Sequence, residues 1–390
     1  MFFNTDDNKS AAQQVKEYYD KLDRKWGKLT ENHNGMPNIP NEHIRRELTK
    51  ILDTTERLYK MGAHMDANMT IGTTQVGVGG SGVMLPKILP PIMRRLIPSL
   101  ITNELVLLQS LPVPDGKIFF EDFLDENGNR VDLKANFNKD YSNSAGEGAD
   151  IKNLQLKMTS DTISCVAKKL KAQWTLELQQ DMYAYLAMTT ESEMVSGIST
   201  QIRMELEGQM MNLLYTSATA GNVNWYTVPP DADTKTIDIQ AYNKTLYHAI
   251  CDADNEIFKK RFVNADWIVA DADICNRLEK LDNFVIDPAE AANRKTIGRR
   301  VLGTLSGKYK VYKDPFFAPS KILLGFTNPD RVHHTGAVMA TYVPAYLTGT
   351  WENPAKMDFV KGFMTRNAMK VVIGDMYATV TIVEGKNPVS

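Results

Sequence analysis

The feature that most limits the possible folds of this 390-residue chain is one long apolar stripe between residues 191 and 214. Thr190 and Glu193 have the spacing of a capping box, which predicts that a helix begins with Thr190 at its N-cap. Apolar side chains then recur every three or four residues, at Met194, Ile198, Ile202, Leu206, Met210 and Leu213. A helix over this range is about 36 Å long. The pattern predicts a spine helix whose methionine-bearing stripe serves core or interface packing, because such a stripe is seldom a ligand site.

A long polar segment precedes this helix, and its two flanks have the pattern of strands. Pro114-Asp115-Gly116 predicts a turn before an extended segment at Lys117–Phe120, and residues 125–150 are rich in Asn, Gly, Asp and Ser. Apolar and polar residues then alternate as in half-buried strands, at Leu154, Leu156 and Met158 and at Ile163, Cys165 and Ala167. Residues 112–168 are therefore expected to form a hairpin that reaches away from the body and is buried on another subunit.

The first 70 residues have a different character, rich in both acids and bases. Two helices are predicted, at about 11–29 and 41–61, with the breaker Asn34-Gly35-Met36-Pro37 between them. Their apolar stripes are thin, and such helices need a partner surface to be stable. We expect an arm that packs on a neighbouring element or subunit.

A glycine stretch, Gly77–Gly82, follows the arm. It lacks the Gly-Lys-Ser/Thr ending of a phosphate loop, no buried strand precedes it, and Pro86 discourages a helix after it. The stretch predicts a hinge, because glycine is used where unusual backbone angles are needed.

Residues 226–330 have the pattern of an α/β lobe. An amphipathic helix is predicted at 242–262, a buried strand at 267–270, and a helix capped by Asp271 that ends near Leu281. A hairpin through Ser306-Gly307 and a strand at 321–326 follow. Residues 337–383 are mostly strand-like, and the last predicted strand is 376–383.

Charge and hydropathy argue against a dedicated nucleic-acid binder, a membrane-spanning protein and a secreted one. The 45 Lys and Arg residues and 47 Asp and Glu residues leave a net charge of −2, whereas a protein that grips DNA phosphates needs a basic surplus. The most apolar window, Met84–Ile101, is interrupted by four prolines and contains Arg94 and Arg95, so it cannot span a membrane. Residues 1–10 have no basic patch before an apolar run and do not form a secretory signal.

No pattern of catalytic, cofactor-binding or metal-ligating residues stands out. Cys165, Cys251 and Cys275 are far apart and predict free buried thiols from a reducing cytoplasm. The histidines form no HExxH motif or Cys/His cluster, since His33, His43, His64, His248, His333 and His334 include only one adjacent pair. The acids Asp252, Asp254 and Glu256, and the pair Asp271 and Asp273, are expected to be solvated or capping carboxylates on helices. We therefore expect no catalytic, cofactor or metal site and no enzyme activity.

Several segments resemble the major capsid proteins of tailed bacteriophages, in particular the T-even myophage group. They cover about residues 84–383 and include Ile92–Ile101, Lys168–Asp181, Gly303–Pro315, Tyr342-Val343-Pro344 and Gly362–Arg366. Two features are specific to that group when they occur in this order and spacing. They are the run Leu-Lys-Ala-Gln-Trp…Gln-Asp within Lys168–Asp181, and the later pair Tyr-Val-Pro and Thr-Arg. The first 70 residues match no segment of it, and we expect this arm to be retained although an N-terminal peptide is commonly removed in that group.

The resemblance implies an α+β tailed-phage major capsid fold. Its parts would be an N-terminal arm at 1–76, a hinge and the start of a peripheral domain at 77–111, and an extended loop at 112–168. The peripheral domain with the spine helix would occupy 169–225, the axial domain 226–336, and a β-rich return to the peripheral domain 337–390.

The resemblance also implies a function, which is self-assembly into hexamers and pentamers of a virion shell. The shell would enclose double-stranded DNA without specific binding, form in the host cytoplasm, and meet scaffold, portal and decoration proteins but no membrane. Alternatives are an encapsulin-like bacterial compartment shell, a nucleotide-dependent enzyme that uses the glycine stretch, and a tail-sheath or baseplate protein.

Overall fold

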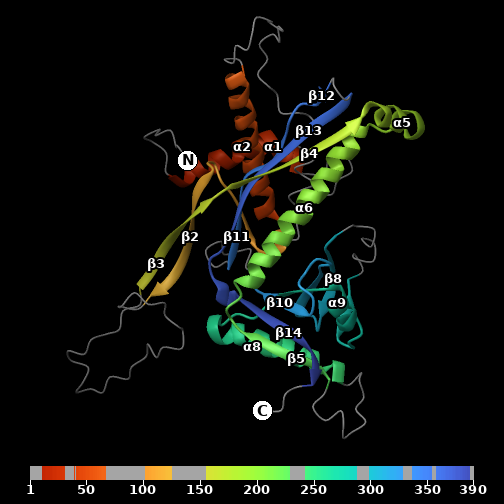
Figure 1. Cartoon of the computed structure of the whole chain (residues 1–390). Coiled ribbons are helices and arrows are strands. Elements are labelled where there is room, and N and C mark those ends of the chain that lie inside the picture. The colour runs from red at the N-terminus through yellow and green to blue at the C-terminus, as the bar shows by residue number, and fades with distance from the viewer. Residues whose placement is uncertain are drawn as a thin grey trace, which may run out of the picture.

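Helix α6 (Thr190–Thr216) connects two sheets in this computed structural model (Figure 1). The structure describes residues 11–30, 39, 41–66, 102–124, 155–228, 242–287, 298–327, 336–353 and 357–386. The predicted stripe is confirmed at its centre, where Ile198, Ile202, Leu206 and Met210 are buried. At the two ends the most buried positions are Val195 and Leu214 rather than Met194 and Leu213, which are partly buried.

The predicted cap of this helix is wrong. The N-cap residue is Thr189, whose carbonyl accepts from the backbone N–H groups of Ser192 and Glu193 but whose side chain makes no capping bond. Thr190 is instead the first helical residue, and its hydroxyl is buried. Because this side chain is buried in the protein interior, its hydroxyl cannot cap the N-terminus of the helix.

A five-stranded sheet lies along one end of α6. Its path is β1 (Leu107–Ser110), β11 (Ala337–Leu347), β13 (Asp358–Val371) and β12 (Trp351–Asn353), and β4 (Val166–Thr175) pairs with the other side of β13. One face packs against α6 through Ala172, Trp174 and Phe363. β13 is thus the central strand of this sheet, because it pairs with β11, β12 and β4.

Helices α1 (Ala11–Thr30) and α2 (Glu42–Asp66) confirm the two helices predicted for the arm. Ile44, Leu48, Ile51 and Leu52 of α2 are buried in the same core as the spine helix. Glu47 of α2 accepts from the backbone N–H of Ser110 in β1 at 2.7 Å. The partner surface that the thin stripe requires is therefore the chain's own five-stranded sheet.

A seven-stranded sheet forms the other end of the molecule (Figure 1), in the order β5-β14-β10-β6-β9-β8-β7. Its strands are β5 (Asn222–Val228), β6 (Trp267–Ala270), β7 (Phe284–Ile286), β8 (Arg300–Leu305), β9 (Tyr309–Lys313), β10 (Lys321–Gly325) and β14 (Tyr377–Lys386). Helices α8 (Thr245–Arg261) and α9 (Ala272–Glu279) contribute to one core with it. The predicted helices, hairpin and strands of this lobe are confirmed.

Two details of this lobe differ from expectation. β14 pairs with β10 and β5, so it belongs to this sheet and not to the peripheral one expected for residues 337–390. Asp271 occupies the N-cap position of α9 but makes no side-chain capping bond. The Ser306-Gly307 turn is as predicted, and both residues have positive φ values, 52° and 66°, as a tight hairpin turn requires.

The remaining elements are the hairpin of β2 (Asp115–Leu124) and β3 (Gln155–Ser164), helix α4 (Thr102–Leu105), helix α5 (Leu176–Leu186) and the 3-10 turn η3 (Gly374–Met376). Among the helices that the structure describes, none combines the length and the apolar character needed to cross a membrane.

Candidate assembly surfaces

The β2–β3 hairpin leaves the body of the molecule (Figure 1). Its strands pair over ten residues each, from Asp115 opposite Ser164 to Leu124 opposite Gln155. It is attached at its base, where Ile118 and Ile163 are buried against the five-stranded sheet. The two strands of the predicted hairpin are confirmed as far as Ser164, and residues 125–150 lie outside the described part of the chain. The predicted end at residue 168 is wrong, because Ala167 already belongs to β4 and pairs with Arg366 of β13.

Lys370 of β13 strengthens this attachment. Its ammonium lies 2.6 Å from the carboxylate of Asp161 and donates to the carbonyl of Thr162 at 3.2 Å. The hydrogen bond from Lys370 lowers the pKa of Asp161. The hairpin is thus fixed near its root.

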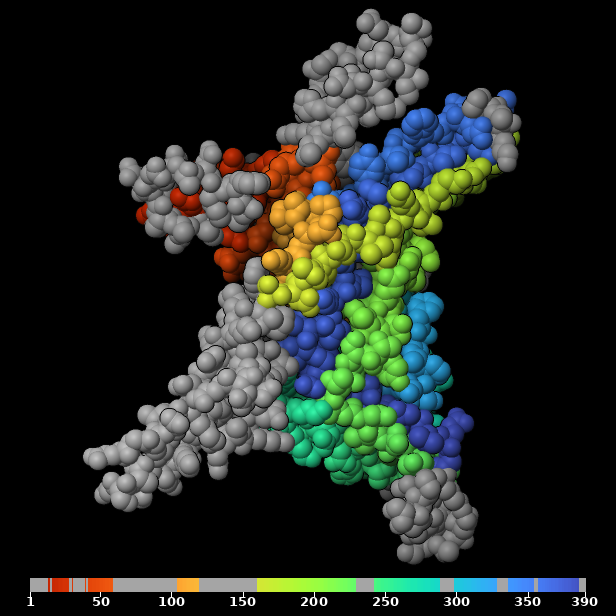
Figure 2. Space-filling model, turned by 60° about the vertical axis from the view of Figure 1, so that its left-hand side comes forward, coloured from red at the N-terminus to blue at the C-terminus, as the bar shows by residue number. Residues whose placement is uncertain are grey.

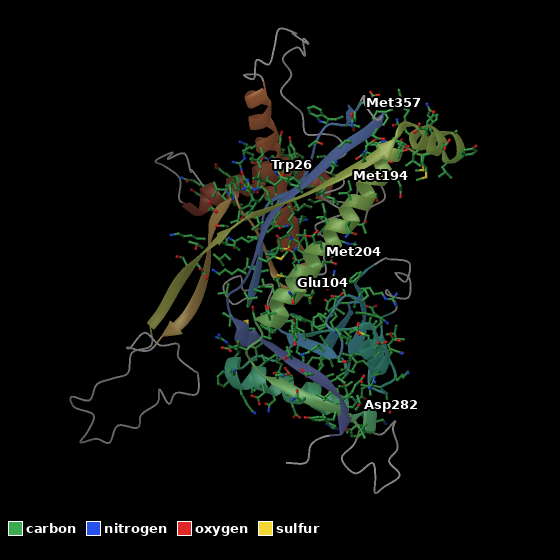
Figure 3. All side chains as sticks on the ribbon, viewed as in Figure 1. Trp26, Glu104, Met194, Met204, Asp282 and Met357 are labelled. Carbon is green, nitrogen blue, oxygen red and sulfur yellow. The ribbon has the colours of Figure 1, made fainter. Side chains whose placement is uncertain are left out.

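The end of the five-stranded sheet that bears α5 and β12 has a concentration of exposed apolar side chains. The three most exposed large apolar side chains of the described residues are here, Tyr185 (84%), Tyr183 (75%) and Trp351 (72%). Met357, also exposed, lies at the same end in Figure 3. We call this end the distal tip and define it by α5, β12 and Met357. Clustered exposed apolar groups of this kind mark contact surfaces.

Strand β4 provides a second surface, seen as the yellow-green band in Figure 2. It pairs with β13 along all ten residues, and no described strand pairs with its other edge. Along it, Val166, Lys169, Leu170 and Lys171 are exposed. A long unpaired edge invites another chain, and lysines are the residues that commonly restrict which chain can bind there.

A cavity of about 250 Å³ lies where α2, α4 and the seven-stranded sheet meet. Glu104, labelled in Figure 3, accepts from Tyr312 at 2.5 Å and pairs with Lys310. Asp266 also lines the cavity, and burial raises the pKa of its carboxyl to about 6. The polar groups of the cavity are mostly bonded to one another across the junction, as expected of a contact between two parts of one subunit.

Some of the carboxylates predicted to be solvated are exposed, and one is buried. Asp252 and Asp273 are exposed, but Asp254 is buried and accepts from the Ala265 N–H at 2.6 Å and the Tyr309 hydroxyl at 2.8 Å. Burial, and then the bond to Asp254, raises the pKa of Tyr309. The solvated interpretation of Asp254 is wrong, because this carboxylate joins α8 to β9. Its helical spacing from the core residues Ile250 and Ile257 was the available signal.

A buried ion cluster joins the spine helix to the seven-stranded sheet, and sequence reasoning missed it. Arg299 lies 2.7 Å from Asp314 and 3.3 Å from Glu207, and all three side chains are buried. Arg299 also donates to the carbonyl of Met204 at 3.0 Å. Glu207 is 92 residues from Arg299, so no local pattern could have revealed the contact.

The described residues hold no group of three or more His, Cys, Asp or Glu side chains able to bind a metal. His43 lies 3.0 Å from the Leu108 carbonyl, and the ring of His248 contacts that of Tyr247. Side chains of the other four histidines, and the glycine stretch Gly77–Gly82, lie outside the described part. The three cysteines are free; Cys275 is buried, and burial raises its pKa to about 12.

Three of the resembling segments come together in one sheet. Leu170, in the Lys168–Asp181 segment, pairs with Phe363, and Arg366 pairs with Val343 on the other side of β13. The segment Gly303–Pro315 forms the β8–β9 hairpin. The segment Ile92–Ile101 lies outside the described residues.

Residues 125–388, more than half of the chain, match the family model described as major capsid protein Gp23. The chain belongs to this family. The resemblance to T-even capsid proteins is thereby confirmed, although the Gp23 model does not extend to the first 124 residues.

Individual relatives agree with this assignment. The major capsid protein of Vibrio phage KVP40 is 25% identical over 280 residues, which cover 67% of this chain and 52% of the relative. That of Enterobacteria phage T4 is 22% identical over 253 residues, which cover 60% and 47%. The chain spans about half the length of the curated relatives that it matches.

Solved capsid structures are also similar to this chain. The capsid of cyanophage P-SCSP1u has a TM-score of 0.46 at 9% identity, with 82% of this chain and 94% of that chain covered. The capsid of Myoviridae phage XM1 has a TM-score of 0.43 at 10% identity, with coverages of 70% and 86%. A virus-like particle from Pyrococcus furiosus has a TM-score of 0.41 at 6% identity, with coverages of 71% and 91%.

Proposed function

We propose that this chain is the shell-forming subunit of a tailed phage, which self-assembles into hexamers and pentamers around double-stranded DNA. Membership of the Gp23 family supports the role, and the observation that carries the mechanism is the β2–β3 hairpin. It is a two-stranded sheet of its own, attached at its base, and an isolated hairpin is marginal in water. An adjacent subunit would provide the surface that stabilises it.

Charge is consistent with this role. The near-neutral chain as a whole suits a wall that encloses DNA without gripping it. Many modest contacts, repeated and closed by symmetry, would then hold the shell.

The parts of the subunit have separate roles in this proposal. The axial domain, 226–336 together with β5 and β14, would cluster around the symmetry axes, and the peripheral sheet would form the wall. The arm would stay on the subunit, since α2 is buried in its core. The proposal also includes scaffold, portal and decoration proteins as partners and the virion as the location. It further includes assembly in the host cytoplasm and the lack of enzyme activity.

Electron microscopy of the expressed full chain tests the role directly. We expect closed shells or hexameric sheets, and a protein that stays monomeric while binding ATP would overturn the proposal in favour of a nucleotide-dependent enzyme. Genes for portal and terminase beside the capsid gene would distinguish a phage from an encapsulin-like compartment, which is expected beside a cargo enzyme. An intact mass of 43.8 kDa from mature particles would show that the arm is retained, and a smaller mass would refute it.

A further inference from the structure

Helix α5 is formed in the subunit without burying any side chain. It is capped at both ends, since Thr175 accepts from the N–H of Leu178 at 3.3 Å and the N–H of Ala187 donates to the Tyr183 carbonyl at 3.1 Å. A helix of 11 residues is nevertheless marginal by itself, because helices draw most of their stability from packing of one face. The helix therefore requires a surface that the described part of its own subunit does not supply.

The orientation of α5 shows which face is available. Gln179 points back to the body, where its amide oxygen accepts from the Trp174 indole at 3.3 Å. At 100° per residue, Glu177 and Asp181 lie about 160° from Gln179, on the opposite side of the helix. Leu178 and Tyr185 flank them, about 100° and 120° from Gln179. All four are exposed. The outward face thus combines two carboxylates with two large apolar side chains.

Charge limits what can cover this face. The distal tip contains three acids, Glu177, Asp181 and Glu352, and no Lys or Arg. Two distal tips would therefore repel each other through like charges, and the complementary surface must be basic as well as apolar.

The unpaired edge of β4 meets both requirements. Lys169 and Lys171 are exposed and have no ion-pair partner among the described residues, whereas Lys168 turns to the spine and bonds Gln209. Successive side chains of a strand point to opposite faces of the sheet, so exposed Val166 and Leu170 lie on the spine face of β4 together with Lys168. The edge therefore presents apolar area on this face and the two lysines on the other.

The spacing of the two lysines on β4 also matches the spacing of the two carboxylates on α5. Two lysines separated by two strand positions are about 6.7 Å apart along β4. Glu177 and Asp181, four helical positions apart, are separated by about 6 Å along α5.

We propose that the outward face of α5 docks on the β4 edge of a second copy of this chain, with Glu177 and Asp181 beside Lys169 and Lys171. The contact is heterologous, since it joins different surfaces on the two copies, and it therefore propagates around a ring or lattice. The inference rests on the proposed shell role and names the surfaces that two neighbouring subunits use.

Charge reversal tests the pairing. Asp181→Lys and Lys171→Glu are each expected to raise the protein concentration needed for shell formation roughly fivefold at low salt. The double variant should return to within about twofold of the wild type, because the pair is restored in reverse. Asp23→Lys, at an exposed position of α1 outside both surfaces and outside the axial domain, is the matched control and should have no effect. Single variants that behave like the control, or a double variant no better than the singles, would overturn the proposal.

Disulfide trapping gives a second measurement. Cys165 and Cys251 are only half-buried and are first replaced by alanine. Oxidised shells made from a mixture of Tyr185→Cys and Lys171→Cys subunits should give covalent dimers, and subunits carrying both changes should give a ladder. Dimers from Tyr185→Cys alone would mean that tips meet tips and would refute the pairing. If the wild type forms no shells, the proposed function fails; if it forms shells that none of these changes affects, only the docking inference fails.

Discussion

The guanidinium of Arg299 lies 2.7 Å from the carboxylate of Asp314, and both side chains are almost completely buried. Glu207, on the spine helix, completes the cluster at 3.3 Å. Because Arg299 pairs with both acids, its removal takes a buried positive charge away from two buried carboxylates at once. The cluster therefore joins the spine to the seven-stranded sheet through charge as well as apolar packing.

Arg299→Ala is expected to lower the free energy of unfolding by about 3–5 kcal/mol, because breaking a buried pair leaves uncompensated charge. Denaturant titration of the unassembled subunit measures this change. Arg300→Ala, at the neighbouring and more exposed position, should change stability by less than about 0.5 kcal/mol. Equal effects of the two substitutions would contradict a structural role for the cluster.

Asp254→Ala should be destabilising by about 2–4 kcal/mol, since it leaves the Ala265 N–H and the Tyr309 hydroxyl without their acceptor. Thermal unfolding followed by circular dichroism is a suitable measurement. The control is Asp252→Ala on the exposed side of the same helix, which should be close to neutral. A larger loss for Asp252→Ala would show that the acids of α8 act through the helix dipole instead.

Asp266 should make stability depend on pH in an unusual direction. Its folded-state pKa, about 6, is above the ordinary value of 3.8, so its contribution is fully present below pH 4 and is lost as pH rises through 6. Asp266→Asn removes this dependence, and the variant should gain up to about 3 kcal/mol relative to the wild type between pH 4 and pH 7. Unfolding titrations of both proteins at the two pH values measure the difference. A constant difference would show that the carboxyl titrates normally.

Leu48→Ala tests whether the arm is part of the folded subunit. Leu48 is completely buried with the spine helix, so the substitution should cost about 2–5 kcal/mol in global stability, as Leu206→Ala on the spine should. Global unfolding unaffected by Leu48→Ala would mean that α2 detaches before the core unfolds.

Elements with a local pattern could be predicted from the sequence, and contacts between distant segments could not. The spine stripe, the β8–β9 hairpin and the strands of the extended hairpin depend on residues close together in the chain. The site of the N-cap was missed because Thr189 and Thr190 are equally suitable caps by type, and only tertiary packing makes one of them face inward.

The β4 edge and helix α5 can be located only in part from the sequence. The Lys168–Asp181 segment stood out as a resemblance, but its division into an unpaired strand and an unburied helix depends on strand pairing with β13, almost 200 residues away. Likewise, β14 continues a strand-rich region, and only its pairing with β10 and β5 places it in the other sheet.

The order in which the strands are synthesised has a consequence for the timing of folding. β13 is the partner of β4, and β14 is the partner of β5. β13 and β14 are the last two strands to be synthesised, and among the described elements only the short η3 turn lies between them. Such long-range pairing delays folding, because the chain must be nearly complete before the contacts form. A subunit still on the ribosome therefore lacks both finished sheets, so nascent chains are kept out of the growing lattice until translation has passed β14.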